Sequence, residues 1–241
     1  MGIRAYISLL RPLFWASVLC CFGFMVSAAA SDQVRVFTHG EGTFASRLKD
    51  GSFEGQGADL LRCSMRALNQ PFVLNQATMA RKPRLTNSGA LDAWFPSLVF
   101  GPSERVNRIA YPIGSMPIYW YVLKGNEVDT SSEEFVRTAK VSAFPGSTPE
   151  SILRSSGYHI QTGTDDENIV VLKLIDGQLD GFLSASFEDI LKPRTKALLV
   201  SRIERILYKN FDAGIEFTEN FVRKNPGFLP RFQHALNTCA E

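Results

Sequence analysis

The stretch AKVSAFPGSTPESILRSSG (residues 139–157) has the pattern of a strand, a glycine turn and the first turns of a helix. Two registers fit the start of this helix. Thr148 can be the N-cap with Pro149 at the first helical position, or Ser147 and Glu150 can form a capping box one residue earlier. Either register predicts that a strand passes directly into a capped helix, which is typical of α/β proteins.

The same turn is a hypothetical anion site. The N-terminus of a helix offers unpaired N–H groups and a positive dipole end, here at Ser147 and Thr148. Gly146 has no Cβ, so a ligand can approach the backbone closely. A glycine turn that only connects two elements is the alternative interpretation.

Strand and helix patterns alternate along the chain on both sides of this stretch, which predicts an α/β fold. The expected strands are residues 34–38, 72–75, 91–96, 118–123, 141–144, 159–162, 181–184 and 213–217, and the expected helices are 57–68, from 148, 166–177 and 230–239. His39, His159 and His234 are scattered, so we expect no metal and no cofactor.

The N-terminus has the pattern of a secretory signal. Two arginines precede an apolar run over residues 13–26, and Ala28 and Ala30 then form an A-x-A pair. The run is shorter than the about 20 residues that span a bilayer, so a retained membrane anchor is the weaker alternative. We expect residues 1–30 to be cleaved and the mature chain to lie in the periplasm.

The charge of the mature chain is balanced. Removing 30 of 241 residues leaves 211, and removing two of the 26 basic residues leaves 24 against 24 acidic residues. Such a balance argues against a nucleic acid or an anionic membrane surface as partner.

Two cysteines remain after this cleavage, because Cys20 and Cys21 lie in the apolar run. An even number of cysteines in an exported chain predicts a disulfide between Cys63 and Cys239. Two unpaired thiols are the alternative.

Four segments, in this order and spacing, resemble the periplasmic solute-binding proteins of ABC importers, in extracellular solute-binding protein family 3, which includes polar amino-acid binders. The segments are GSFEGQGADLLRCSMRAL, SGALDAWFPSLVFGPSERVNRIAYP, KVSAFPGSTPE and LKLIDGQLDGFLS. The resemblance implies the two-lobed periplasmic binding protein fold (type II), with two crossing strands as hinge. It places lobe one at residues 31–117 plus 208–241, and lobe two at residues 118–207.

The resemblance also implies how a ligand is held. Arg105 in GPSER stands at the place of a T-P-x-R turn whose arginine binds the ligand carboxylate, although Gly101 replaces the threonine and the turn is one residue longer. Guanidinium suits a carboxylate because it donates two parallel hydrogen bonds. Ser147 and Thr148 would meet the same carboxylate from lobe two. An arginine that only pairs with Glu104 or caps a helix is the alternative.

Other positions depart from the family pattern. The acid that receives the ligand ammonium in amino-acid binders is replaced by Ala185, while the serine-rich strand keeps Ser97. The loop after the first strand offers further ligand contacts, namely His39, Glu41 and Phe44. The alternatives are a core position for Phe44 and a solvated charge for Glu41.

These features together predict a monomeric, non-catalytic binding protein. It would deliver a small, carboxylate-bearing, amino-acid-like solute to an ABC-type permease. A dehydratase-like enzyme on the same fold, with His39 or Glu41 as general base, is one alternative. A sensory binding module without its own transporter is another.

Overall fold

A computed structural model describes residues 33–40, 42–126 and 128–241 of the chain. The expected signal peptide, residues 1–30, and the candidate ligand residue Glu41 lie outside the described residues. Within the described ranges, no helix has the length and apolar character that crossing a membrane requires.

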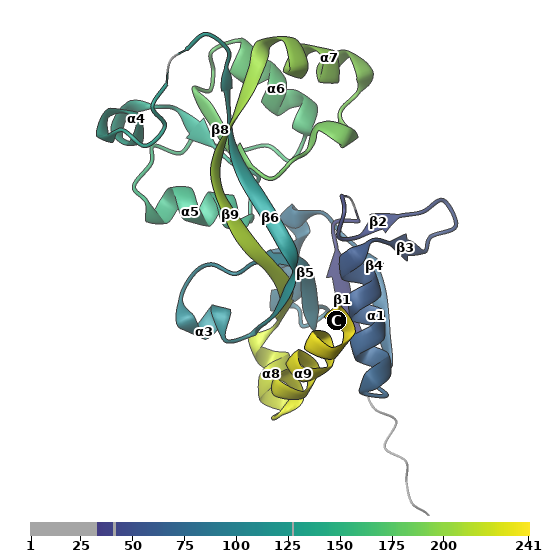
Figure 1. The fold of residues 1–241 in the computed structure, drawn as a ribbon. Helices are drawn as coiled ribbons and strands as arrows, with labels where there is room; N and C mark the ends of the chain where they lie inside the picture. Colours follow the sequence, from purple (N-terminus) through teal and green to yellow (C-terminus); the bar gives the residue numbers. More distant parts are fainter. Residues whose placement is uncertain (1–32, 41, 127) are drawn as a thin grey trace, which may run out of the picture. The chain divides into compact units, whose positions relative to one another are not determined.

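A seven-stranded mixed sheet runs through the described chain, in the order β4-β1-β5-β9-β6-β8-β7 (Figure 1). Its strands are β1 (Val34–Thr38), β4 (Phe72–Gln76), β5 (Ala93–Leu98), β6 (Ile109–Leu123), β7 (Val141–Ser142), β8 (Gly181–Ser184) and β9 (Ile203–Phe217). β1 pairs in parallel with β4 and β5, whereas β9 is antiparallel to β5 and β6. β2 (Ser46–Arg47) and β3 (Phe53–Glu54) form a separate hairpin.

The helices follow the strands in the expected alternation. They are α1 (Gln56–Ala67), η1 (Met79–Arg81), α2 (Lys82–Asn87), α3 (Ser103–Val106), α4 (Glu133–Thr138), α5 (Thr148–Ser155), α6 (Glu167–Ile175), η2 (Glu188–Ile190), α7 (Pro193–Arg202), α8 (Glu219–Lys224) and α9 (Phe228–Ala240). The α/β prediction is therefore confirmed.

β6 and β9 are the two long strands that cross between the lobes (Figure 1). They pair from Ile109 opposite Glu216 to Leu123 opposite Ile203. The sequence predicted only residues 118–123 and 213–217 of them. The missed part of β9, residues 203–212, is largely exposed and mixes apolar with charged residues, so it carries no regular alternating apolar pattern.

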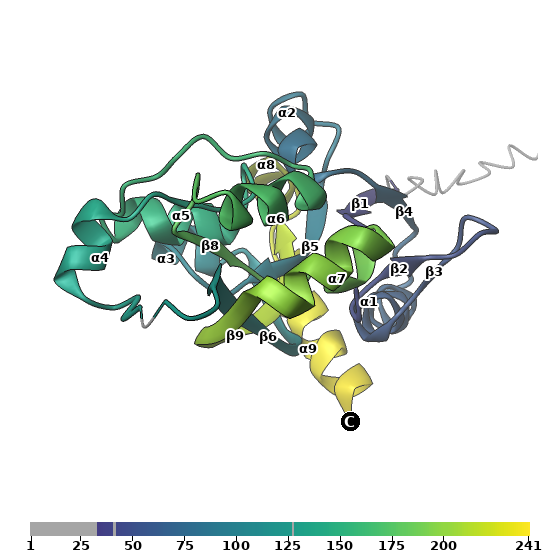
Figure 2. The ribbon, with the colours of Figure 1, turned by 90° about the horizontal axis from the view of Figure 1, so that it is seen from above.

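Separate hydrophobic clusters lie at the two ends of these long strands. One cluster joins β1, β5 and β9 with α1 and α9, and includes the fully buried Leu61, Met65 and Phe232. Two further clusters lie beside β6 and β8, and one of them joins α6 to α7, which are neighbours in Figure 2. This division agrees with two lobes, and the residue boundaries of the lobes stay a prediction.

The expected disulfide is present. Cys63 of α1 and Cys239 of α9 are joined with an S–S distance of 2.01 Å and a Cα–Cα distance of 6.0 Å, across a sequence separation of 176 residues. Both helices pack on the same hydrophobic cluster. The prediction from the cysteine count is confirmed, and the bond ties the end of the described chain to its first helix.

Candidate functional site

Arg105, the expected carboxylate receptor, is bound to a carboxylate of the chain itself. Its Nε donates to Glu216 Oε1 at 3.0 Å and its Nη2 donates to Glu216 Oε2 at 3.0 Å, which is the bidentate geometry of a strong ion pair. Its Nη1 donates to the carbonyl oxygens of Leu98, at 3.1 Å, and of Phe100. The guanidinium of Arg105 is therefore hydrogen-bonded to groups of the protein itself.

Two more side chains converge on the same carboxylate. Lys82 Nζ lies 2.9 Å from Glu216 Oε2, and the Ser97 hydroxyl donates to that oxygen at 3.0 Å. The side chains of Lys82, Arg105 and Glu216 are 19%, 21% and 12% exposed, and Ser97 is buried. Lys82, Ser97, Arg105 and Glu216 are called the Glu216 cluster below.

The sheet topology assembles this cluster from four elements. β9 inserts between β5 and β6, so Glu216 lies directly opposite Trp94 on β5 and Ile109 on β6. β5 also carries Ser97 near its end, while α2 begins at Lys82 and α3 holds Arg105. Residues more than a hundred positions apart in sequence are thus brought together at Glu216.

Charge interactions hold Glu216 in its ionised form. Burial alone would raise the pKa of its carboxyl group, but the positive charges of Lys82 and Arg105 outweigh burial and lower the pKa to about 2. Burial lowers the pKa of the Lys82 ammonium, and the neighbouring carboxylate opposes that effect. Because the folded pKa of Glu216 lies below its ordinary value of 4.5, the resulting stability is present above about pH 4.5 and is lost as the pH falls towards 2.

The start of α5 caps itself in the register of the capping box. The Ser147 hydroxyl accepts from the Glu150 N–H at 3.2 Å, and Glu150 Oε2 accepts from the Gly146 N–H at 2.8 Å. The Ser147 N–H donates to the Phe144 carbonyl at 3.1 Å, and Pro149 has no N–H. Within the described residues, Thr148 alone keeps an unpaired backbone N–H in this first turn, so the predicted anion site has few donors left.

Gly146 brings this turn close to the segment that contains Lys82. Its φ of 75° favours glycine, and a Cβ at this position would lie 3.4 Å from the Met79 carbonyl oxygen and 3.8 Å from Pro83 Cγ. The turn between β7 and α5 therefore lies against η1 and the first residues of α2, next to the Glu216 cluster.

Two of the candidate ligand residues, His39 and Phe44, lie in the loop after β1. The backbone carbonyl of His39 accepts a hydrogen bond from Gln76 Nε2 at 2.9 Å. Burial lowers the pKa of the His39 imidazole. Phe44 is buried in the cluster around α1, with its ring against Gly114, which favours the core alternative over a ligand contact. The ligand roles of His39, Phe44 and Ser97 stay predictions.

Ala185, which stands where the family pattern has an acid, is half-buried. The next acid in the sequence is Glu188, and its carboxylate has partners within the chain. Glu188 Oε1 accepts from the Tyr121 hydroxyl at 3.1 Å and lies 2.7 Å from Arg205 Nη1. Burial and the Glu188 charge raise the pKa of Tyr121. Arg205 also lies over the Tyr119 ring, at 4.8 Å from its centroid.

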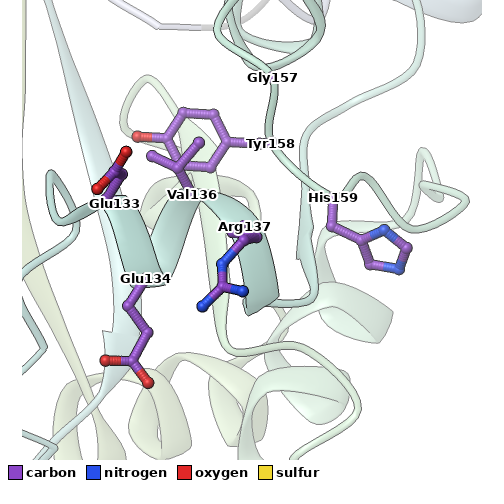
Figure 3. Close-up of a pocket in the computed structure, with 7 residues that line it drawn as sticks. All are labelled: Glu133, Glu134, Val136, Arg137, Gly157, Tyr158 and His159. Atoms are coloured by element: carbon purple, nitrogen blue, oxygen red, sulfur yellow. The ribbon is translucent and has the colours of Figure 1, made fainter.

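A surface hollow lies elsewhere, between α4 and the segment after α5 (Figure 3). Its volume is about 770 Å³, and it is lined by Glu133, Glu134, Val136, Arg137, Gly157, Tyr158 and His159. In Figure 3 the His159 ring points away from the two glutamates, so the polar groups do not converge on one point. In the described part of the chain, no three His, Cys, Asp or Glu side chains lie close enough to hold a metal ion.

Comparison with known proteins identifies the fold. No protein-family model matches the chain, and no curated protein matches its sequence. The arginine-, lysine-, histidine-binding protein ArtJ from Geobacillus stearothermophilus matches with a TM-score of 0.61 and 16% identity, over 86% of this chain and 89% of that one. A histidine kinase sensor domain with similarity to periplasmic binding proteins matches with a TM-score of 0.65 and 14% identity, over 87% and 90% of the two chains.

A third similar structure is the ancestral amino-acid-binding protein AncCDT-1, described as a precursor of cyclohexadienyl dehydratase. It matches with a TM-score of 0.59 and 17% identity, over 86% of this chain and 89% of that one. The chain therefore has the two-lobed fold of periplasmic amino-acid-binding proteins, as predicted. At these identities the likeness concerns the fold, and the ligand has to be argued from the residues of this chain.

Proposed function

We propose that this protein is a non-catalytic, periplasmic solute-binding protein, which captures a small polar solute between its lobes and delivers it to an ABC-type permease. The observation that carries the proposal is the fold, with two long strands, β6 and β9, running between separate hydrophobic clusters. A solute that contacts both lobes favours the closed form of such a protein, because it binds that form better than the open one.

The partners of two acids, Glu216 and Glu188, argue against catalysis. A general base works best with a pKa near the working pH, whereas the pKa of Glu216 is lowered to about 2 by the two neighbouring cations. Glu188 is paired with Arg205 and Tyr121. Both acids are thus held as partners of cations, which suits a binding protein better than a dehydratase.

A sensory module is the second candidate, since the histidine kinase sensor domain has the same fold over most of both chains. Both candidates bind a solute and differ in what the closed form contacts. Loss of solute uptake on deletion of the gene would favour delivery to a permease. Unchanged uptake with an altered transcriptional response would favour sensing.

The binding proposal predicts a solute-dependent rise in thermal stability. The mature chain, purified from the periplasm and checked by intact mass for cleavage before Ser31, is screened against neutral polar solutes, amines, amino acids and organic acids. A solute at a hundredfold excess over its dissociation constant adds about 2.7 kcal/mol to the free energy of unfolding, which raises the melting temperature by several degrees. A panel without a single shift, together with unchanged X-ray scattering, would contradict the proposal.

A further inference from the structure

We infer that Glu216 is a built-in carboxylate that fills the anion subsite formed by Lys82, Ser97 and Arg105, and so excludes solutes that would place a carboxylate there. The inference rests on the proposed function in one respect, namely that solutes enter the space between the lobes. The inference narrows the solute class to molecules that bind without placing a carboxylate on Arg105, such as uncharged polar solutes and amines.

The geometry is that of an occupied carboxylate receptor. Glu216 Oε1 accepts from Arg105 Nε, and Oε2 lies within hydrogen-bond distance of Arg105 Nη2, Lys82 Nζ and the Ser97 hydroxyl, at distances of 2.9–3.0 Å. A carboxylate accepts about four hydrogen bonds, so this one is fully engaged. The donors come from three elements, α2, β5 and α3, whereas the carboxylate comes from β9.

The position of the cluster makes it relevant to a solute. The turn at Gly146, from the other end of the long strands, lies against Met79 and Pro83, the residues that flank Lys82 in η1 and α2. This contact therefore brings the start of α5 next to the segment that carries Lys82 of the Glu216 cluster. The three cluster side chains that carry charge remain 12–21% exposed, so they are accessible at their edge.

A dissolved carboxylate competes poorly with Glu216 for these donors. The tethered carboxylate acts at a high effective concentration, whereas a free one loses translational entropy on binding. Exchange of one carboxylate for another forms no additional ion pair and leaves the displaced Glu216 without its partners. The wild-type cluster should therefore leave small carboxylates unbound.

A second acid is engaged in the same way near the opposite end of β6 and β9, where Tyr121 lies opposite Arg205. Glu188, three residues after Ala185, lies 2.7 Å from Arg205 Nη1 and accepts from the Tyr121 hydroxyl. An α-amino acid needs a cation for its carboxylate and an anion for its ammonium. Arg105 is already paired with a carboxylate, and Glu188, the first acid after Ala185, is already paired with a cation, which favours a solute other than a free α-amino acid.

The test is chemical rescue of the Glu216→Ala variant by acetate. Thermal unfolding is measured for the wild type and the variant in acetate and in chloride at equal ionic strength. We expect the variant to melt at a lower temperature than the wild type and to recover about 5 °C with acetate in a saturable manner, since acetate can bind the vacated donors. The wild type should respond equally to both salts.

Asp92→Ala is the matched control. Asp92 also forms a bidentate pair, with Arg35 at 2.8 Å, and it is 14% exposed, but it lies outside the Glu216 cluster. Specific rescue of Glu216→Ala, with no comparable response of Asp92→Ala, supports the inference. Absence of rescue, or an equal response of both variants, overturns it.

Calorimetric titration of the wild type keeps the test decisive if Glu216→Ala does not fold. Acetate, glycine and L-arginine are titrated into the wild type and into Arg105→Ala. The inference predicts no Arg105-dependent binding of any of them. Binding to the wild type that Arg105→Ala abolishes would overturn the inference and leave the proposed function standing. Absence of such binding, together with a thermal shift from a neutral polar solute of the screen described above, supports both.

Discussion

Arg105→Ala is expected to lower the free energy of unfolding by about 2 to 4 kcal/mol in the absence of any solute. The substitution removes a bidentate partner of Glu216, which is 12% exposed, and leaves that carboxylate with Lys82 and Ser97. Truncating one partner of a buried ion pair costs about 3 to 5 kcal/mol, and the residual exposure and remaining donors reduce this figure. Urea unfolding of the wild type and the variant measures the difference.

Arg137→Ala is the control for this experiment. Arg137 is exposed on α4 and should change the free energy of unfolding by no more than about 0.5 kcal/mol. If Arg105→Ala were equally harmless, its guanidinium would be a solvated group that waits for a ligand, as the sequence alone suggested. The ion pair between Arg105 and Glu216 would then contribute nothing to the free energy of unfolding.

Replacing both Cys63 and Cys239 by serine is expected to cost up to about 5 kcal/mol, the chain-entropy value for a loop as long as the 176-residue separation. The bond limits the unfolded chain, and this effect exceeds the packing lost with the two sulfurs, since Cys63 is exposed and Cys239 only half-buried. Reduction of the wild type should lower the stability by a similar amount. Free thiols in the unreduced, denatured wild type would contradict the bond, and an unchanged free energy of unfolding would contradict its contribution.

The fold was largely predictable from local patterns. Alternating strand and helix signals identified β1, α1 and α6, because each buries apolar residues on one face. β4 was identified as well, although Phe72 and Leu74 are only partly buried. The expected strand at residues 159–162 is reduced to a single bridge between Val141 and Ile160. The exposed part of β9, residues 203–212, was missed because its strand conformation is imposed by pairing with β6 and not by a regular apolar pattern of its own.

The candidate site was only half predictable. The capping box of Ser147 and Glu150 spans four residues, so sequence alone predicts it as one of two registers. Arg105 was identified through a resemblance, but its partner Glu216 lies 111 residues away and meets it only because β9 inserts beside β5. A glutamate inside the apolar strand AGIEF is the one local signal that was available, since a charge in a strand core requires a partner.

The most direct test of the central claim, that Glu216 is the resident partner of Arg105, is a double-mutant cycle. The free energy of unfolding is measured in urea for the wild type, Arg105→Ala, Glu216→Ala and the double variant, all without solute. We predict that the two single losses overlap, with a coupling energy of about 2 kcal/mol or more between the side chains. Losses that add to within about 0.5 kcal/mol would show two independent residues and would contradict the account.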